Sequence, residues 1–415
     1  MCLIRTGLRS LHEKTKFPSL RLFAVTFASS GALSWFFVMT LDFNFLFQNI
    51  TDSQFWIFLG LVLFYGFGAL SAFIGVYMQS EITRKHLLLW STTLGVLSTG
   101  ALAVFRGEVF AVIVSILLGT SFGIGFPSSA ALFADHTTAK NRGKTAGILV
   151  LMTFVLISLE MVFVNVFSFG LVGTIVVIMS LRSTSYLALI ATCEKEKNKK
   201  ELSYSTILTE RNIALYLIPW VLFNLVSGLS NFIYPGLPDT PDYERVLEIG
   251  NLMQFLGLAS VSLVSGYLSD RFGRKPPVVI GVVTFGVSFA ILTIATSTDN
   301  LIIQLTLHGI AWGFCMVAYF AIPGDIASNY SKEKFYAIFT VFPFISYMAT
   351  GTLPAILDFS VEANILSPIL SILLFLSVVP VLFAQETLPE KTIRERKLKE
   401  HIGKVHKVVA ESETQ

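Results

Sequence analysis

The stretch GYLSDRFGRK, residues 266–275, separates two long apolar runs. It holds four charged side chains, those of Asp270, Arg271, Arg274 and Lys275. A charged side chain in the hydrocarbon core of a bilayer is costly, so such a cluster belongs where a helix reaches water. The sequence therefore predicts a polar hairpin between two membrane-spanning helices.

The composition outside this hairpin is also that of a membrane protein. Of the 415 residues, 53% are hydrophobic and only 14% are charged, whereas about 25% of residues are charged in soluble domains. Windows of roughly 20 apolar residues recur along the chain, and each is long enough to cross a bilayer as a helix. Lipid offers no hydrogen-bond partners to an open backbone, so these windows must be α-helices rather than strands.

We therefore predict an all-α membrane protein with twelve transmembrane helices in two six-helix bundles. The expected helices cover residues 22–46, 55–78, 87–105, 109–134, 145–167, 170–191, 212–234, 247–268, 277–296, 301–327, 335–356 and 365–384. The expected domains are a cytoplasmic N-terminal segment (1–21), a first bundle (22–192), a cytoplasmic linker (193–211), a second bundle (212–385) and a cytoplasmic C-terminal tail (386–415).

Basic residues are distributed unequally between the two sides of these helices. Of the 30 Lys and Arg residues, 27 fall in segments on one side. Arg106 and Arg245 fall on the other side, and Arg182 lies within a helix, from which its long side chain is expected to reach the cytoplasmic headgroups. Since basic loops stay in the cytoplasm, both termini are predicted to be cytoplasmic in a multi-pass protein of the cell membrane.

The second half of the chain repeats the first at a shift of 190 residues. At this shift Arg84, Lys85, Gly119, Gly123, Asp135 and Lys144 align with Arg274, Lys275, Gly309, Gly313, Asp325 and Lys334. A register kept across several helices predicts two halves related by a parallel repeat.

Together these features resemble the major facilitator superfamily of secondary transporters. The resemblance extends over residues 20–390 and is strongest in the hairpin between the eighth and ninth helices. There Gly266, Asp270, Arg271, Gly273, Arg274 and Lys275 stand where the family has them. In the first half the same motif is eroded, because Ser80 takes the place of the aspartate.

The resemblance implies that the hairpin acts as a latch during alternating access. Asp270 is expected to accept hydrogen bonds from basic groups and from the N-terminal end of a neighbouring helix, and Asp325 is the first choice as acidic partner of the basic residues. Such contacts favour an outward-open state and break when the cytoplasmic side opens. The expected gating residues are Gly266, Asp270, Arg271, Gly273, Arg274, Lys275 and Asp325, with Arg84, Lys85, Asp135 and Arg142 from the first half. We expect the second-half hairpin to dominate; the alternative is that the cluster only determines topology.

The family's central pathway runs along helices one, four, seven and ten, so polar side chains on these helices and their neighbours are candidate substrate ligands. They are Ser30, Ser34, Trp220, Asn224, Asn231, Asn251, Gln254, Trp312, Tyr319 and Tyr347. Each also suits an ordinary hydrogen bond or packing contact between helices.

Three ionisable side chains within the helices are candidates for proton coupling. Glu160 is the first choice and Asp42 the second, since a carboxyl group can titrate as it faces each side in turn. His308 is the third, with a packing role as the alternative. For Glu160 the alternative is a structural contact with a neighbouring helix.

These expectations favour a proton-coupled symporter for sugar- or metabolite-type uptake. Drug antiporters of the family carry an arginine in helix four and a Gly-Pro motif in helix five, whereas here Ser115 stands at the arginine position and the fifth helix has no such motif. A multidrug or metabolite efflux carrier and a non-transporting receptor or scaffold with the same fold stay open as alternatives.

No catalytic activity is predicted for this chain. RGKT at 142–145 lacks the upstream glycine of a phosphate-binding loop. The three cysteines, Cys2, Cys193 and Cys315, predict neither a disulfide framework nor a metal site. We expect no cofactor, no metal and no nucleic-acid partner. The expected partners are a small-molecule substrate, the lipid bilayer and protons, and the expected oligomeric state is a monomer.

Overall fold

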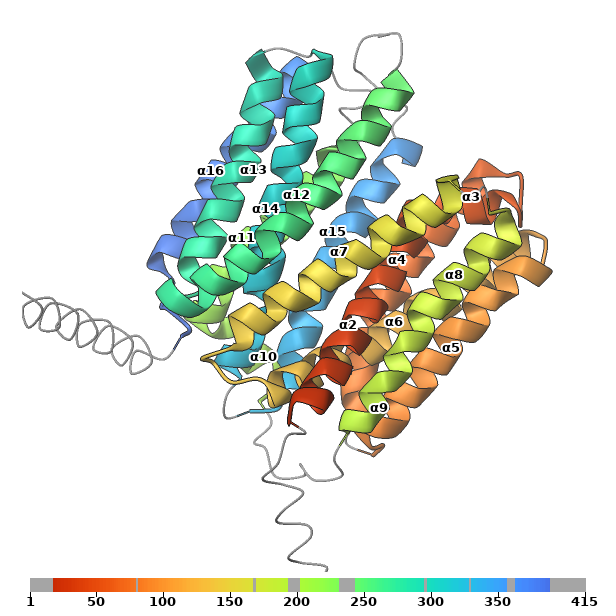
Figure 1. Ribbon diagram of the computed structural model, residues 1–415, viewed down its shortest axis with the longest axis horizontal. Helices are drawn as coiled ribbons and strands as arrows, with labels where there is room; N and C mark the ends of the chain where they lie inside the picture. Colours follow the sequence, from red (N-terminus) through yellow and green to blue (C-terminus); the bar gives the residue numbers. More distant parts are fainter. Residues whose placement is uncertain are drawn as a thin grey trace, which may run out of the picture. The chain divides into compact units, whose positions relative to one another are not determined.

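A computed structural model describes residues 18–79, 81–166, 169–192, 202–230, 243–294, 297–327, 330–356 and 363–388. Its helices in the first half are α2 (Pro18–Leu41), α3 (Phe43–Gln48), α4 (Gln54–Met78), α5 (Arg84–Val104), α6 (Glu108–His136), α7 (Arg142–Val166), α8 (Leu171–Ser183), the 3-10 helix η1 (Thr184–Leu187) and α9 (Ala188–Ala191). In the second half they are α10 (Tyr204–Thr209), α11 (Arg211–Leu229), α12 (Tyr243–Phe272), α13 (Lys275–Ile294), α14 (Thr298–Ile326), α15 (Lys332–Ile356) and α16 (Ala363–Phe383) (Figure 1).

The predicted all-α membrane fold is confirmed. Within the described residues, eleven helices are long and apolar enough to cross a membrane. The helix α15, with 25 residues, occupies the place of the remaining predicted span. The predicted N-terminal segment and C-terminal tail lie largely outside the described residues. Of the predicted linker, residues 193–201 lie outside them, while residues 202–211 contain α10 and the first residue of α11.

One predicted helix is shorter than expected. The first span was predicted to run unbroken to residue 46, but α2 ends at Leu41 and the short helix α3 begins at Phe43. Asp42 between them leaves the helical conformation, with φ −91° and ψ 7°. This break falls at a carboxyl side chain that is turned into the protein, as described below.

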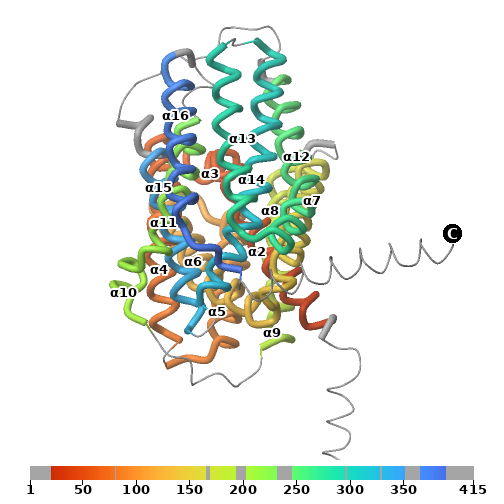
Figure 2. Tube along the Cα trace, turned by 90° about the vertical axis from the view of Figure 1, so that its left-hand side faces the viewer, coloured from red at the N-terminus to blue at the C-terminus, as the bar shows by residue number. Residues whose placement is uncertain are grey.

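The chain forms two compact units. Unit 1 comprises Met1–Thr137 and Leu159–Asn198, and unit 2 comprises Thr138–Ser158 and Lys199–Gln415. The division falls within α7, whose first part groups with unit 2 and whose last part groups with unit 1. In unit 2, α13 packs against both α14 and α16, and the three helices lie side by side in both views (Figures 1 and 2).

Close backbone contacts in the two units follow the 190-residue shift. In unit 1, α4 and α6 meet where a Cβ on Gly119 would overlap the carbonyl oxygen of Phe64. In unit 2, α12 and α14 meet where a Cβ on Gly309 would overlap the carbonyl oxygen of Gln254. Gly119 and Gly309 are 190 residues apart, and so are Phe64 and Gln254. The glycines allow the helices to approach closely, as small residues do in membrane proteins.

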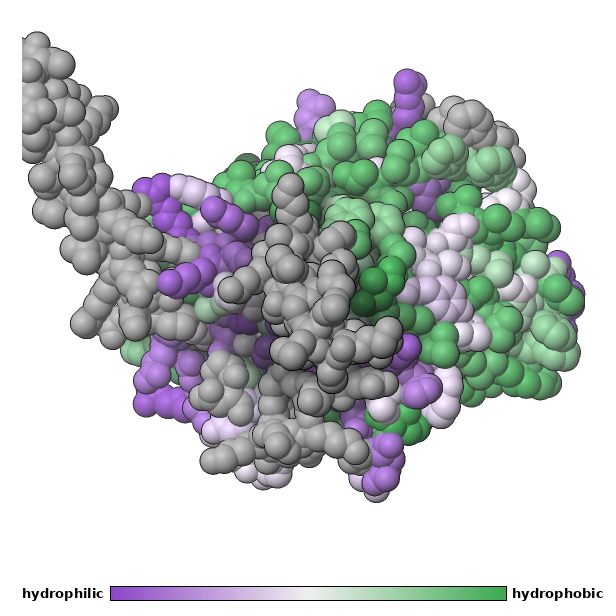
Figure 3. Space-filling view, turned by 60° about the horizontal axis from the view of Figure 1, so that its bottom comes forward, coloured by the Kyte–Doolittle hydropathy of each residue, from purple (hydrophilic) through white to green (hydrophobic). Residues whose placement is uncertain are grey.

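Much of the described surface is apolar. Large hydrophobic side chains such as Leu97, Ile294 and Phe383 are exposed. In the view of Figure 3 hydrophobic residues (green) cover broad areas, while hydrophilic residues (purple) gather in separate patches. Exposed apolar patches of this extent fit contact with lipid rather than with water.

Candidate functional site

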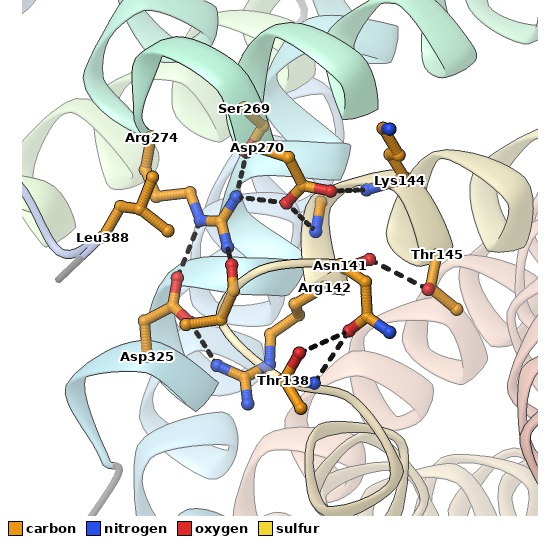
Figure 4. Close-up of polar contacts among 12 residues, drawn as sticks. Thr138, Asn141, Arg142, Lys144, Thr145, Ser269, Asp270, Arg274, Asp325 and Leu388 are labelled. Carbon is orange, nitrogen blue, oxygen red and sulfur yellow. Dashed lines mark hydrogen bonds and ion pairs between the residues drawn. The ribbon is translucent and has the colours of Figure 1, made fainter. Parts of the chain in front are cut away.

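The hairpin between α12 and α13 holds a buried guanidinium between two carboxylates. Arg274 donates from Nη1 to Asp270 Oδ1 at 2.9 Å and from Nε to Asp325 Oδ2 at 2.7 Å (Figure 4). Nη1 also donates to Ser269 Oγ at 2.9 Å, and Nη2 donates to the carbonyl oxygen of Ala139 at 3.0 Å. The side chain of Arg274 is fully buried. Asp325, the expected acidic partner, therefore forms the expected ion pair.

The same carboxylates hold the N-terminal end of α7. The backbone N–H groups of Gly143 and Lys144 donate to Asp270 at 2.8 and 2.9 Å. Arg142 Nη1 donates to Asp325 Oδ1. A carboxylate at this position satisfies N–H groups that have no partner within the helix and interacts favourably with the positive end of its dipole. Asp270 thus makes both kinds of contact expected for it.

Two glycines permit this contact between α7 and α12. A Cβ on Gly143 would collide with Asp270 Oδ1, and a Cβ on Gly266 would collide with the carbonyl oxygen of Gly143. Any larger residue at either position would push the end of α7 away from the carboxylate. The sequence motif therefore specifies close backbone packing as well as charge.

Charge is balanced within this cluster. Burial disfavours the charged form of Arg274, but Asp325 and Asp270 outweigh this effect and raise the pKa of Arg274 above its ordinary value. With Arg142, the cluster contains two guanidinium groups and two carboxylates. A buried, hydrogen-bonded pair of this kind is costly to break by removing one partner. The cluster can hold α7, α12 and α14 together as long as all four charges are present.

Glu386, three residues after the end of α16, also holds the hairpin, and the sequence patterns did not reveal it. Its carboxylate accepts from the backbone N–H groups of Arg274 at 2.7 Å and Lys275 at 3.2 Å. The chain turns at Gly273, whose φ of 110° favours glycine. Glu386 lies in the stretch QETLPE, residues 385–390, and only tertiary contact shows that its carboxylate binds the hairpin.

The other expected gating residues have more exposed positions. Arg271 is exposed and donates to the hydroxyl of Tyr267 on its own helix, and Lys275 Nζ donates to the carbonyl oxygen of Leu382 at 2.9 Å. Lys85 is exposed. Arg84 forms an ion pair with Asp135 at 2.8 Å in unit 1, at positions that match the Arg274–Asp325 pair of unit 2 after the 190-residue shift.

The two carboxyl groups chosen for proton coupling meet in unit 1. Asp42, at the break between α2 and α3, interacts with Glu160 on α7 through a side-chain hydrogen bond. Glu160 is buried. One oxygen of each group, Asp42 Oδ2 and Glu160 Oε1, is enclosed without a hydrogen-bond partner. Two carboxylates in such close contact would repel each other, and a shared proton would relieve this repulsion.

His308 lies in unit 2, in a cluster of aromatic side chains. Trp312 Nε1 donates to His308 Nε2 at 2.9 Å. Since the indole N–H can only donate, Nε2 carries no hydrogen and the imidazole is held as its Nδ1–H form. The ring stacks on Phe285 with centroids 4.4 Å apart. This surrounding suits the packing alternative for His308.

The expected substrate ligands of α11, α14 and α15 belong to the same cluster. Trp220 stacks on Tyr319 with centroids 4.4 Å apart and lies edge-on to Trp312. Ser227 Oγ accepts from Trp312 Nε1 at 3.3 Å and from the hydroxyl of Tyr347 at 3.4 Å. Ser227 is the polar centre that connects these three helices.

The remaining expected ligands are more scattered. Asn224 is buried on α11, and its Oδ1 has no partner. Ser30 and Ser34 are buried on α2, where Ser34 donates to the carbonyl oxygen of Ser30 at 2.8 Å. On α12, Asn251 is exposed and Gln254 is half-buried. Asn231 lies outside the described residues.

The expectation for Arg182 is wrong. Its side chain was expected to reach the cytoplasmic headgroups, but it is 2% exposed and points into unit 1. Its guanidinium is bound by carbonyl oxygens of α5 and α6, which turn it inward. The described residues contain no group of histidine, cysteine and acidic residues that could hold a metal ion.

Comparisons with known proteins agree with this architecture. Residues 246–410 match the family model of the Major Facilitator Superfamily. A stretch of 112 residues is 31% identical to the multidrug resistance protein MdtL of Klebsiella pneumoniae (strain 342), covering 26% of this chain and 28% of that protein. The MdtL protein of Shewanella oneidensis is also 31% identical over 112 residues, with the same coverage. The chain therefore matches less than a third of the length of these curated relatives.

A solved structure resembles nearly the whole chain. The crystal structure of the human organic anion transporter MFSD10 (TETRAN) superposes with a TM-score of 0.72, covering 88% of this chain and 100% of that one. The sequence identity is 13%, so this likeness concerns the fold alone.

Proposed function

We propose that the chain is a transporter of the major facilitator superfamily, whose family model matches residues 246–410, and that it moves a small organic solute by proton-coupled alternating access. The observation that carries the proton coupling is the contact between Asp42 and Glu160. A pair that shares one proton can release it when a water path reaches the site and take it up again from the other side. The substrate and the protons are the partners of this cycle, with the bilayer as the surrounding medium.

The charged cluster at the hairpin supplies the gate in this proposal. Asp270 and Asp325 hold the N-terminal end of α7, while Glu160 lies 18 residues further along the same helix. At a rise of about 1.5 Å per residue, these two places are about 27 Å apart. A single helix thus carries the proton site near one end and the latch at the other. Breaking the latch would release α7 and open the cytoplasmic side.

The aromatic cluster of unit 2 is the proposed substrate-binding region. Trp220, Trp312, Tyr319 and Tyr347 offer broad apolar faces, with Ser227 and Asn224 as polar groups among them. Pockets for small organic molecules have this composition, mostly aromatic with a few polar groups. Within unit 1, the buried Ser30 and Ser34 are separately proposed as substrate ligands.

The direction of transport has two candidates. Uptake by proton symport is favoured by Ser115 at the position of the drug antiporters' arginine and by the lack of their Gly-Pro motif in the fifth helix. Efflux is favoured by the relatives, which are named multidrug resistance proteins. The structural neighbour is named an organic anion transporter. We propose an orientation with both termini in the cytoplasm and a monomer as the working unit.

Transport by purified protein in liposomes tests this proposal. Labelled glucose, salicylate, leucine and ethidium would be offered with and without an imposed pH gradient, while an enclosed dye reports internal pH. We expect one of these classes to accumulate against its gradient together with a change in internal pH. Specific binding without any flux would favour the receptor or scaffold alternative.

The variant Glu160→Gln tests the proton site. It should abolish gradient-driven accumulation and spare exchange of solute across the membrane, because glutamine keeps the shape but cannot release a proton. Asp42→Asn should have the same effect. Glu108→Gln is the matched control, since Glu108 is an exposed acid of unit 1 at the start of α6. Full accumulation by Glu160→Gln would exclude this residue from coupling.

A further inference from the structure

Arg182 is a buried positive charge without a carboxylate partner in the part of the chain that the structure describes. It lies on α8, and its side chain is 2% exposed. Its interactions are hydrogen bonds to two carbonyl oxygens and a contact with the Trp35 ring. The guanidinium Nε is enclosed without a partner. By contrast, Arg274 is balanced by carboxylates.

Backbone carbonyl groups of α5 and α6 bind this guanidinium. Its Nη2 donates to the carbonyl oxygen of Ser91 at 3.1 Å and to that of Ser121 at 3.0 Å. The two helices are in close contact at two places. A Cβ on Gly125 of α6 would meet Ser91 Oγ of α5, and a Cβ on Gly95 of α5 would meet Ser121 Oγ of α6. Gly95 also leaves room for Arg182, because a Cβ there would lie 2.5 Å from Nε.

Carbonyl dipoles hold the guanidinium but do not neutralise it. Arginine stays protonated in proteins, so Arg182 keeps a full positive charge inside unit 1. Transfer of an unpaired charge into an apolar interior is strongly unfavourable, and buried charges in membrane helices are usually paired. A neutral amide or hydroxyl could join the same carbonyl oxygens without this cost. The charge itself therefore needs another explanation than bridging α5 and α6.

The surroundings of Arg182 are apolar and aromatic. Its Cζ lies 4.8 Å from the ring centre of Trp35 on α2. Trp35 stacks on Phe122, with ring centroids 6.3 Å apart, and Phe122 stacks on Phe36 and Phe126 at 4.5 and 4.8 Å. A ligand complementary to this charge and these rings would combine one negative group with an apolar or aromatic body.

We propose that Arg182 is the counter-ion of an anionic group on the transported solute, a carboxylate or sulfonate attached to an aromatic or apolar body. The guanidinium suits such groups because its fork of N–H donors matches their paired oxygens. The site would open to the solute during the transport cycle, with Trp35 beside the bound ring. This inference rests on the proposed transport function and names the class of its substrate.

Binding to the purified full-length protein tests the inference with a matched pair of probes. Benzenesulfonate and benzenesulfonamide share a ring and a sulfonyl group, but only the first is charged at neutral pH. We measure the affinity of each by thermal stabilisation in gluconate buffer. We expect benzenesulfonate to bind about ten- to a hundredfold more tightly, the effect of hydrogen bonds to a charged partner. Equal affinities, or no binding of benzenesulfonate, would overturn the inference without any variant.

Variants of Arg182 show where the anion binds, and a parallel measurement with chloride shows whether the anion is organic or inorganic. Arg182→Gln should remove the preference for the anion, Arg182→Lys should retain part of it, and Arg106→Gln, at an exposed arginine of unit 1, should leave it unchanged. A preference that survives in folded Arg182→Gln would place the anion elsewhere. Stabilisation by chloride but not by benzenesulfonate would assign the site to an inorganic ion and overturn the solute assignment.

The outcome is separable from that of the proposed function. Proton-driven flux of a neutral solute, together with equal binding of the two probes, would overturn this inference and leave proton-coupled transport intact. Anion-selective binding through Arg182, without flux of any solute, would support the binding site and overturn the transport function.

Discussion

Replacing Asp270 by Asn should weaken the proposed latch more than any other conservative change in the hairpin. Asp270 accepts from Gly143 N at 2.8 Å, from Lys144 N at 2.9 Å and from Arg274 Nη1 at 2.9 Å. Asparagine keeps one acceptor oxygen but presents an NH₂ group where the second oxygen was. It also leaves a buried guanidinium with one carboxylate fewer.

Removing one partner of a buried ion pair costs about 3–5 kcal/mol. At about 1.4 kcal/mol for each tenfold change, the equilibrium between latched and released states should shift by about two to three and a half orders of magnitude. The labelling rate will show only part of this shift, because opening of the protein stops limiting the rate once the open state is frequent. We therefore expect the observed effect on accessibility to be at least about tenfold.

The assay follows a cysteine at Ala327, which is fully buried at the end of α14, close in sequence to Asp325. Cys2, Cys193 and Cys315 are replaced by alanine, and labelling by a membrane-impermeant maleimide is timed from each side of the membrane. Asp270→Asn should speed labelling from the cytoplasmic side. Arg271→Gln is the control, because Arg271 is exposed and donates to the hydroxyl of Tyr267 on its own helix. Rates within about twofold of the parent protein would refute the latch.

Three further changes test other parts of the structure. Arg84→Gln should change accessibility in the same assay by less than about tenfold, since the Arg84–Asp135 pair is partly exposed and such pairs contribute about 0–1 kcal/mol. An effect equal to that of Asp270→Asn would contradict the asymmetry of the two halves. Glu386→Gln should destabilise the start of α13 by about 0.5–2 kcal/mol, measured as a lower melting temperature than that of Glu248→Gln, a change at an exposed acid of α12. Gly309→Ala should destabilise the protein by about 1–3 kcal/mol because its Cβ would overlap the carbonyl oxygen of Gln254. Gly170→Ala, at a site with no atom within 4 Å of the added Cβ, should leave the melting temperature unchanged, and equal melting temperatures for the two variants would contradict the close packing of α12 and α14.

The membrane class, the helices and the repeat follow from the sequence because they depend on local patterns. The length of an apolar run decides whether it spans a bilayer, and the spacing of glycines and charges carries the 190-residue register. The same register reappears in the contact of Gly119 with Phe64 and of Gly309 with Gln254. The hairpin motif predicted Asp325 as a partner because the family resemblance pointed to that helix.

Helix packing decided which side chains meet. Asp42 and Glu160 are 118 residues apart, and nothing local in either segment shows that their carboxyl groups share one place. Arg182 was expected at the headgroups, since a long basic side chain can extend along its own helix to water. The structure instead turns it towards the backbone of α5 and α6, where Gly95 leaves space for it. A sequence shows which charges lie in apolar segments, but only the tertiary structure decides their partners, because electrostatic and hydrogen-bond energies depend on distance in space.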